Sequence, residues 1–232
     1  MIRNDFEIYL NCENPEVVKK YFDLYPFLAG VTTNPAMISR LGRTDYFNIL
    51  KEIREVIGNK KLFAQVISHD YNEIIEEAML IRRAGGENTI VKIPAMEFGI
   101  KAIHTLTEMG IRTLGTLVCS TIQGVMAIQA GAEIVVPFYF HMKDAGLDPV
   151  SVTRELVEYT KVSGTGKVIS AAHRTLEEFG ECIGLGVHGL TLNPDFITMG
   201  MLNDTAVKNL NFFTESWEKV FGSGTKIIDL AK

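Results

Sequence analysis

The sequence has few cysteines and no long apolar run, and both features limit what the chain can be. Its 232 residues include three cysteines, which lie far apart and form no C-x-x-C pair. Such thiols are typical of a reduced protein, so we expect a cytoplasmic location and no disulfide framework. No apolar run approaches the ~20 residues that a transmembrane helix needs. We therefore expect no membrane partner.

An excess of positive charge is also missing. The formal net charge is −5, with 23 Lys and Arg against 28 Asp and Glu, and the basic residues are scattered. Nucleic-acid-binding proteins gather such residues on one face, so we expect no nucleic-acid partner. The 47% of hydrophobic and 22% of charged residues are the balance of a folded globular protein.

Several motifs of cofactor and metal chemistry are absent. No G-x-G-x-x-G follows the first predicted strand, where a dinucleotide-binding fold would place it. The five histidines form no H-x-x-x-H pair, although His173 and His188 could converge in space. There is no G-x-S-x-G either. We expect no metal and no cofactor, and a metal-dependent aldolase is a disfavoured alternative.

What the sequence does contain is a repeated alternation of short apolar runs with longer stretches of helical period, such as 71–83. The apolar runs are candidate strands: Phe6–Leu10, Ala29–Thr32, Leu62–Ile67, Thr89–Ile93, Arg112–Leu117, Ile134–Pro137, Val168–Ala171 and Gly189–Thr191. This pattern predicts an α/β fold, a single (β/α)₈ TIM barrel domain over residues 1–232. An open doubly wound sheet is the main alternative.

The C-terminal part predicts one further element. Residues 203–221 have the pattern of a helix, and Gly222-Ser223-Gly224 would end it. We expect the segment 203–232, helix and tail, to pack on a neighbouring subunit of a homo-oligomer.

Lys92 is the most unusual residue of the candidate strands, because it stands alone in the apolar run Ile90-Val91-Lys92-Ile93-Pro94. A barrel strand is covered by helices outside and by packed side chains inside, and neither surrounding favours a charged ammonium group. A lysine there should have a lowered pKa, and its neutral amine could attack a carbonyl to form an imine. An edge-strand lysine that blocks aggregation is an equal alternative from these residues alone. A closed barrel has no edge, which favours the catalytic interpretation.

Polar residues follow the predicted strands. They are Asn11, Thr32, Asn34, Gln65, Thr116, His173 and Arg174. Asn34 and Thr116, taken singly, are more typical of a helix cap and a core hydroxyl. Together the residues would form a ring of hydrogen-bonding groups that suits a polyhydroxylated substrate.

Two of the strand ends repeat one pattern, Gly30-Val31-Thr32-Thr33-Asn34-Pro35 and Gly189-Leu190-Thr191-Leu192-Asn193-Pro194. In both, Asn can cap a helix that begins at Pro, and shared turn chemistry is the favoured explanation. Arg174 follows the seventh strand, where barrels commonly bind phosphate. His141 and Lys143 could add to that anion site, although a solvated Lys143 is favoured.

These residues resemble the transaldolase family, and most closely its small branch that includes fructose-6-phosphate aldolase. The resemblance runs nearly end to end and rests on stretches such as Gly30–Pro35, Leu62–Val66, Val91–Pro94, Thr113–Thr116 and Ala130–Glu133. It implies a (β/α)₈ barrel with a class I, Schiff-base mechanism and no cofactor. It also implies a ring of five subunits, or two stacked rings, that exchange C-terminal helices.

Carried over by position, the resemblance gives each residue a role. Lys92 would form the imine with a ketose, and Thr32 and Asn34 would bind substrate hydroxyls. Gln65 would hold the water that moves protons, with Thr116 as its partner. Arg174 would bind the distal anion of the sugar.

The chain departs from the family at several positions. Asn11 replaces an aspartate and cannot act as a base. Gln65 is similar to the aldolase branch, whereas Phe138 is similar to transaldolases, because the aldolase has a tyrosine there. Ala172 replaces a phosphate-binding serine, and His141 stands where the family has a second arginine. An ordinary sugar phosphate is thus in question, and a sulfonated or neutral sugar becomes plausible.

The resulting hypothesis is an enzyme of carbohydrate metabolism, such as the pentose phosphate route, that transfers a dihydroxyacetone unit from a ketose to an acceptor aldehyde. Cleavage to dihydroxyacetone and an aldehyde, as in fructose-6-phosphate aldolase, is the first alternative. A catalytically silent sugar-binding relative is the second.

Overall fold

Eight parallel strands form a closed barrel in the computed structural model, which describes residues 6–231. The strands are β1 (Glu7–Asn11), β2 (Gly30–Thr32), β3 (Lys61–Gln65), β4 (Thr89–Pro94), β5 (Thr113–Val118), β6 (Ile134–Pro137), β7 (Lys167–Ser170) and β8 (Gly189–Leu192). Each pairs with the next along the chain, and β8 pairs with β1. The predicted TIM barrel is confirmed, and the doubly wound alternative is wrong. The predicted domain also includes residues 1–5 and 232, which lie outside the described residues.

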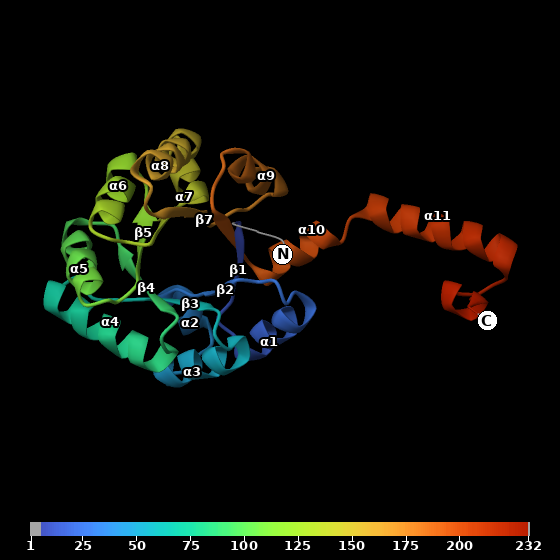
Figure 1. Ribbon diagram of the computed structural model, residues 1–232, viewed down its shortest axis with the longest axis horizontal. Coiled ribbons are helices and arrows are strands. Elements are labelled where there is room, and N and C mark those ends of the chain that lie inside the picture. Colours follow the sequence, from blue (N-terminus) through green and yellow to red (C-terminus); the bar gives the residue numbers. More distant parts are fainter. Residues whose placement is uncertain (1–5, 232) are drawn as a thin grey trace. The chain divides into compact units, whose positions relative to one another are not determined.

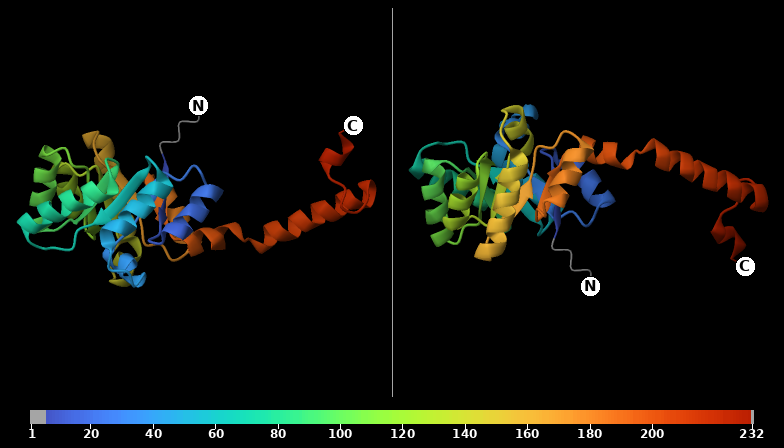
Figure 2. Two further views of the ribbon diagram at one scale, coloured as in Figure 1. Left: turned by 90° about the horizontal axis from the view of Figure 1, so that it is seen from below. Right: turned by 90° about the horizontal axis from the view of Figure 1, so that it is seen from above.

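The helices surround the strands in every view (Figures 1 and 2). They are α1 (Pro15–Leu24), α2 (Pro35–Arg40), α3 (Tyr46–Ile57), α4 (Tyr71–Gly85), α5 (Glu97–Glu108), α6 (Thr121–Gln129), α7 (Tyr139–Asp144), α8 (Pro149–Ser163) and α9 (Leu176–Gly184). The local sequence explains why several of these helices begin where they do. Asn14, Asn34 and Asp148 each cap a helix whose first residue is Pro. Pro loses nothing there, since the first N–H of a helix has no partner within it.

The predicted third strand was too long at its C-terminal end. It was expected to reach Ile67, but β3 ends at Gln65. The reason is a side chain of α4, since the Glu77 carboxylate accepts hydrogen bonds from the backbone N–H groups of Ile67 and Ser68 at 2.6 and 3.1 Å. Because these two N–H groups donate to Glu77, they do not take part in the hydrogen bonding between strands.

Strand pairing determines which residues face the inside of the barrel. Tyr9, Phe63, Ile90, Leu114, Ile134 and Ile169 belong to one buried cluster. Paired residues of parallel strands point to the same side, and the register joins Phe63 to Ile90 and Leu114 to Ile134. The cluster is therefore the packed interior of the barrel.

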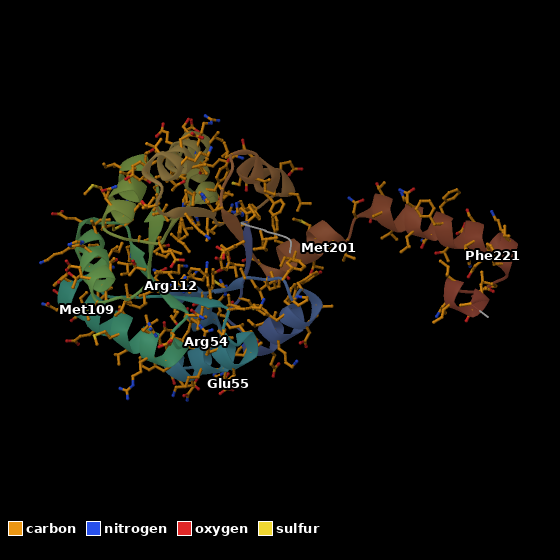
Figure 3. All side chains as sticks on the ribbon, viewed as in Figure 1. Arg54, Glu55, Met109, Arg112, Met201 and Phe221 are labelled. Carbon is orange, nitrogen blue, oxygen red and sulfur yellow. The ribbon has the colours of Figure 1, made fainter. Side chains whose placement is uncertain are left out.

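Charged side chains fill the N-terminal end of the barrel. Lys61 and Lys167 lie 2.7 and 3.1 Å from the Glu7 carboxylate, and Arg112 pairs with Glu133 at 2.7 Å. Figure 3 shows Arg112 inside the ring of helices. Burial acts to raise the pKa of Glu7, but hydrogen bonds from Lys61 and Lys167 outweigh it and lower the pKa. With this end occupied by ion pairs, the C-terminal end remains for a substrate.

Both copies of the repeated pattern begin with glycine for one physical reason. A Cβ at Gly30 would lie 2.0 Å from the backbone oxygen of Lys61, and one at Gly189 would lie 2.3 Å from that of Glu7. No side chain fits such a close approach. The two glycines therefore let β2 and β8 approach their neighbouring strands.

The chain divides into two compact units, residues 1–194 and 195–232. The second unit contains most of α10 (Pro194–Met201), α11 (Asp204–Phe221) and the short 3₁₀ helix η1 (Ile227–Leu230). The predicted C-terminal helix is thus confirmed as α11, which Asn203 caps. The expectation of a single domain whose tail packs on a neighbouring subunit stays a prediction. Among residues 6–231, no helix combines the length and apolar character required to cross a bilayer.

Candidate active site

Strand register brings most of the predicted site residues to the inner face at the C-terminal end of the barrel. Asn11 is paired with Thr32, and Gln65 with Lys92. Thr116 is paired with Pro94, two residues after Lys92 on the same face of β4. The sequence pattern alone placed these residues at strand ends, and the closed barrel makes them neighbours.

Lys92 is buried at the centre of this group, with 8% of its surface exposed. Its Nζ donates a hydrogen bond to the backbone oxygen of Thr33 at 2.9 Å. Burial lowers the pKa of Lys92 to about 8. An amine with this pKa is partly neutral at physiological pH and can act as a nucleophile. The alternative of an edge-strand lysine is wrong, because β4 is paired on both sides.

Asn11 belongs to a hydrogen-bonded group that spans three strands. Thr32 donates to Asn11 Oδ1 at 2.9 Å, and Asn11 Nδ2 donates to Asn193 Oδ1 at 2.7 Å. The hydroxyls of Thr32 and Thr191 are 2.5 Å apart. Thr191 and Asn193 were not predicted as site residues. Their signal was the repeated Thr-x-Asn-Pro pattern, which was attributed to helix capping.

Gln65 and Thr116 have polar groups that find no partner in the part of the chain that the structure describes. Neither side chain makes a hydrogen bond within residues 6–231, and the Thr116 hydroxyl is fully buried. Buried polar atoms usually have partners, so these two groups are suited to hold a water molecule or a substrate hydroxyl.

Backbone strain occurs at the same end of the barrel. Among the described residues, Leu117 and Ala172 are the non-glycine residues with positive φ, at 58° and 62°. Leu117 follows Thr116 at an irregularity in the pairing of β5 with β6, and Ala172 follows β7. Strain of this kind gathers at functional sites, where the surrounding structure maintains it.

Asn34 caps α2 in the way its sequence context suggested. Its Oδ1 accepts a hydrogen bond from the N–H of Met37 at 2.9 Å. Its Nδ2 makes no hydrogen bond within the described residues and can still donate to a ligand. Phe138 follows β6, packs against the barrel interior, and forms a bridge with Ala171.

Arg174 is an exposed cation whose backbone is firmly held. Its N–H donates to the buried carboxylate of Glu178 at 2.8 Å. Its guanidinium lies over the ring of Phe140, 3.1 Å from the centroid. Phe140 was not predicted as a site residue. Its contact with Arg174 joins two separate elements, α7 and the loop after β7, and the sequence pattern does not show that these elements pack together.

The neighbouring histidines differ in their surroundings. His173 is buried, and its Nε2 lies 2.9 Å from the Ser170 hydroxyl. Burial lowers the pKa of His173 to about 4, although nearby Glu178 acts in the opposite direction, so the ring is neutral at pH 7. His141 is exposed and lies beside Phe138, with 5.2 Å between ring centroids. Lys143 pairs with Glu178 at 3.2 Å, so it supports the loop of Arg174.

His173 and His188, which the sequence left free to converge in space, lie far apart in the fold. His173 follows β7 at its C-terminal end, whereas His188 precedes β8 at the opposite end of the barrel. There its Nδ1 accepts a hydrogen bond from the N–H of Val168. Across residues 6–231, no three His, Cys, Asp or Glu side chains gather as a metal-binding group.

Comparison with solved structures shows the fold. Thiamine phosphate pyrophosphorylase from Pyrococcus furiosus superposes with a TM-score of 0.57 at 16% identity, over 83% of this chain and 88% of that chain. A structure described as "Native KDPGal structure" gives a TM-score of 0.56 at 14% identity, over 83% and 84% of the two chains. At such identities the likeness concerns the barrel alone.

Sequence comparison identifies the family. A protein of Streptococcus pneumoniae named "Probable fructose-6-phosphate aldolase" is 30% identical over 213 residues, which are 91% of this chain and 96% of that protein. The family model described as transaldolase/fructose-6-phosphate aldolase matches residues 10–227. This range includes Lys92 and the whole ring around it, and the chain therefore belongs to the transaldolase/fructose-6-phosphate aldolase family of enzymes.

Proposed function

We propose that the enzyme transfers a dihydroxyacetone unit from an anionic ketose to an acceptor aldehyde through a Schiff base at Lys92, without a cofactor. The observation that carries this proposal is a buried lysine with a pKa of about 8, surrounded by uncharged hydrogen-bonding groups at the open end of a barrel. A neutral amine in such surroundings attacks ketones readily.

The reaction begins when Lys92 Nζ attacks the C2 carbonyl of the ketose and water leaves, which gives an iminium ion. The C3–C4 bond then breaks as the C4 hydroxyl loses its proton, the product aldehyde leaves, and an enamine remains on Lys92. The enamine carbon attacks the acceptor aldehyde, whose oxygen gains a proton. Water finally hydrolyses the new iminium ion and releases the product ketose and Lys92.

The groups around Lys92 suit the proton transfers of this sequence. Gln65 lies beside Lys92, and the buried Thr116 hydroxyl lies one strand further round the barrel. In the proposal they hold a water molecule that carries protons to and from the substrate. Thr32, Asn34 and Asn11 bind its hydroxyl groups.

Two competing fates of the enamine define the alternatives. Phe138 faces the interior and has no proton to donate, which slows protonation of the enamine and favours transfer. Gln65 and the relative named a probable fructose-6-phosphate aldolase favour the second candidate, protonation and hydrolysis to free dihydroxyacetone.

Arg174 is the proposed contact for the anion of the substrate. Its guanidinium is stacked on Phe140 and its N–H donors remain exposed. Ala172 offers no hydroxyl, and the exposed His141 of α7 lies beside Phe140. A site with one arginine suits a sugar phosphate or a sulfonated ketose such as sulfofructose, since both place oxygen acceptors in the fork of the guanidinium.

A substrate panel tests the proposal. Fructose 6-phosphate, sulfofructose and fructose are each incubated with the enzyme, with and without glyceraldehyde 3-phosphate as the acceptor. The proposal expects a new ketose only when an anionic donor and the acceptor are both present. Free dihydroxyacetone formed without an acceptor would instead establish the aldolase alternative. No turnover of any donor would contradict both.

We also propose that the enzyme is a cytoplasmic homo-oligomer, a pentamer or decamer. Within the C-terminal unit, Leu210, Phe212, Phe213, Ile227 and Ile228 are at least 62% exposed, which is unusual for apolar side chains. The described chain has free cysteines, as expected in a reducing compartment. Sedimentation analysis of the full chain and of Phe213→Glu tests the assembly, since the variant should dissociate. A monomeric wild type would contradict it.

A further inference from the structure

The Asn11 side chain is hydrogen-bonded to Thr32 and Asn193, and Thr191 in turn contacts Thr32. Thr32 comes from β2, and Thr191 and Asn193 come from β8 and the residue after it. The register joins Tyr9 to Thr191, so the side chains two residues further on, Asn11 and Asn193, share the inner face of the barrel. Barrel closure thus brings together residues that lie 182 positions apart.

Counting protons fixes the direction of these hydrogen bonds. The Thr32 hydroxyl has one proton, which it donates to Asn11 Oδ1. Thr191 must therefore donate to Thr32 across their 2.5 Å contact. Asn11 Nδ2 has two protons, and one of them goes to Asn193 Oδ1. The other makes no hydrogen bond within residues 6–231.

We propose that Asn193 is a positioning residue that fixes the Asn11 amide, so that its remaining N–H points to an oxygen of the ketose bound at Lys92. Without Asn193, the Asn11 amide could rotate by half a turn, and its oxygen and its nitrogen would exchange places. The Thr32 hydroxyl would then face either an acceptor or a donor. With Asn193, Asn11 offers a donor to the substrate. This inference rests on the proposed Schiff-base function.

The chemical consequence concerns the charge at this position. A carboxylate at residue 11 would accept a proton from a substrate hydroxyl, whereas the fixed amide donates a hydrogen bond to the oxygen that becomes negative as the C3–C4 bond breaks. The proton of that hydroxyl then goes to the water held by Gln65 and Thr116. Asn11 and Asn193 would act as one unit that stabilises the developing charge without titrating.

Substitutions at residue 193 test this unit in the full-length enzyme. Asn193→Leu has a similar size but no acceptor, and we expect kcat/KM to fall about tenfold, mainly through kcat. Asn193→Asp keeps the acceptor and should recover most of that loss above the pKa of the new carboxyl group. Asn72→Leu, at an exposed position of α4, is the matched control and should behave as wild type.

A pH profile distinguishes positioning from a structural role. In Asn11→Asp, the Asn193 amide can turn and donate a hydrogen bond to the new carboxylate, so the pKa of the carboxyl group at residue 11 stays low. In Asn11→Asp/Asn193→Asp, two carboxyl groups at hydrogen-bonding distance cannot both ionise freely, and the acid limb of kcat/KM should move toward neutral pH. A residue 193 without contact to residue 11 would leave that limb unchanged.

The outcomes separate this inference from the proposed function. Borohydride trapping of wild type with dihydroxyacetone comes first, and the lack of an adduct at Lys92 overturns both. If the adduct forms, wild-type kinetics in Asn193→Leu or an unmoved acid limb in the double variant overturns the inference alone. If Asn193→Leu fails to fold, Asn193→Asp and the pH profiles still decide.

Discussion

The side-chain nitrogen of Lys92 lies 2.9 Å from the backbone oxygen of Thr33, two strands away in the barrel. A carbonyl oxygen can accept a hydrogen bond from either the ammonium or the neutral amine. It therefore holds the nitrogen in place in both states and leaves the lone pair of the neutral amine free to attack. Among the described residues no carboxylate pairs with Lys92, and burial alone accounts for its lowered pKa.

The pH dependence of imine formation follows from that pKa. Lys92 reacts as the neutral amine, and with a pKa of about 8 this form is a minority at pH 7. We expect the rate of borohydride trapping with dihydroxyacetone to rise about tenfold per pH unit below pH 8 and to level off above it. A midpoint near the pKa of a free lysine would contradict the predicted environment.

Replacing Lys92 by methionine should stabilise the protein while abolishing its activity. The folded-state pKa is lowered, so the unfolded chain binds the proton more tightly, and the cost of the buried charge is fully present below pH 8. This cost falls as the pH rises from about 8 toward the unfolded value. At pH 7 we expect Lys92→Met to raise the free energy of unfolding by at most about 3 kcal/mol.

Urea denaturation at pH 7 and at pH 10 measures this gain. It should shrink at the higher pH, where the lysine of the folded wild type is already neutral. Lys51→Met, at an exposed position of α3, is the control and should show no such change. A destabilised Lys92→Met at pH 7 would mean that the buried ammonium is better solvated than its surroundings suggest.

Ala172→Gly tests the strain at the end of β7. Ala172 has a φ of 62°, which costs an alanine on the order of 1 kcal/mol and a glycine almost nothing. We expect the variant to be about 1 kcal/mol more stable, with a higher KM for an anionic ketose because the backbone before Arg174 becomes looser. Ala84→Gly, within α4, should be less stable than wild type. Equal destabilisation by both changes would show that Ala172 is unstrained.

Phe140→Leu tests the support of the anion contact. The ring of Phe140 lies under the guanidinium of Arg174, and such exposed cation–π contacts contribute about 0.5–1 kcal/mol. We expect KM for fructose 6-phosphate to rise up to about fivefold, while KM for the uncharged fructose stays the same. Phe27→Leu, at an exposed position after α1, is a matched control. An equal rise for both sugars would show that Phe140 acts on the barrel in general.

The barrel fold and the position of Lys92 within a strand could be predicted from the sequence, because both depend on local residue patterns. Alternation within 90–94 places Lys92 on one face of its strand, and only a closed sheet decides that this face is the interior. The contacts of Asn193 and Phe140 could not be predicted in this way. Asn193 meets Asn11 through barrel closure, and Phe140 meets Arg174 through the packing of α7 beside the loop after β7. Helix capping was a sufficient explanation for an asparagine at position 193, so nothing in the sequence pointed to its hydrogen bond with Asn11.

Borohydride trapping identifies the reactive nitrogen of the enzyme directly. Wild-type enzyme is treated with borohydride in the presence of dihydroxyacetone and then digested and analysed by mass spectrometry. We expect a reduced three-carbon adduct on the peptide that contains Lys92, and none on Lys92→Met. An adduct on another lysine, or none with any ketose under conditions where the enzyme turns over, would contradict this expectation.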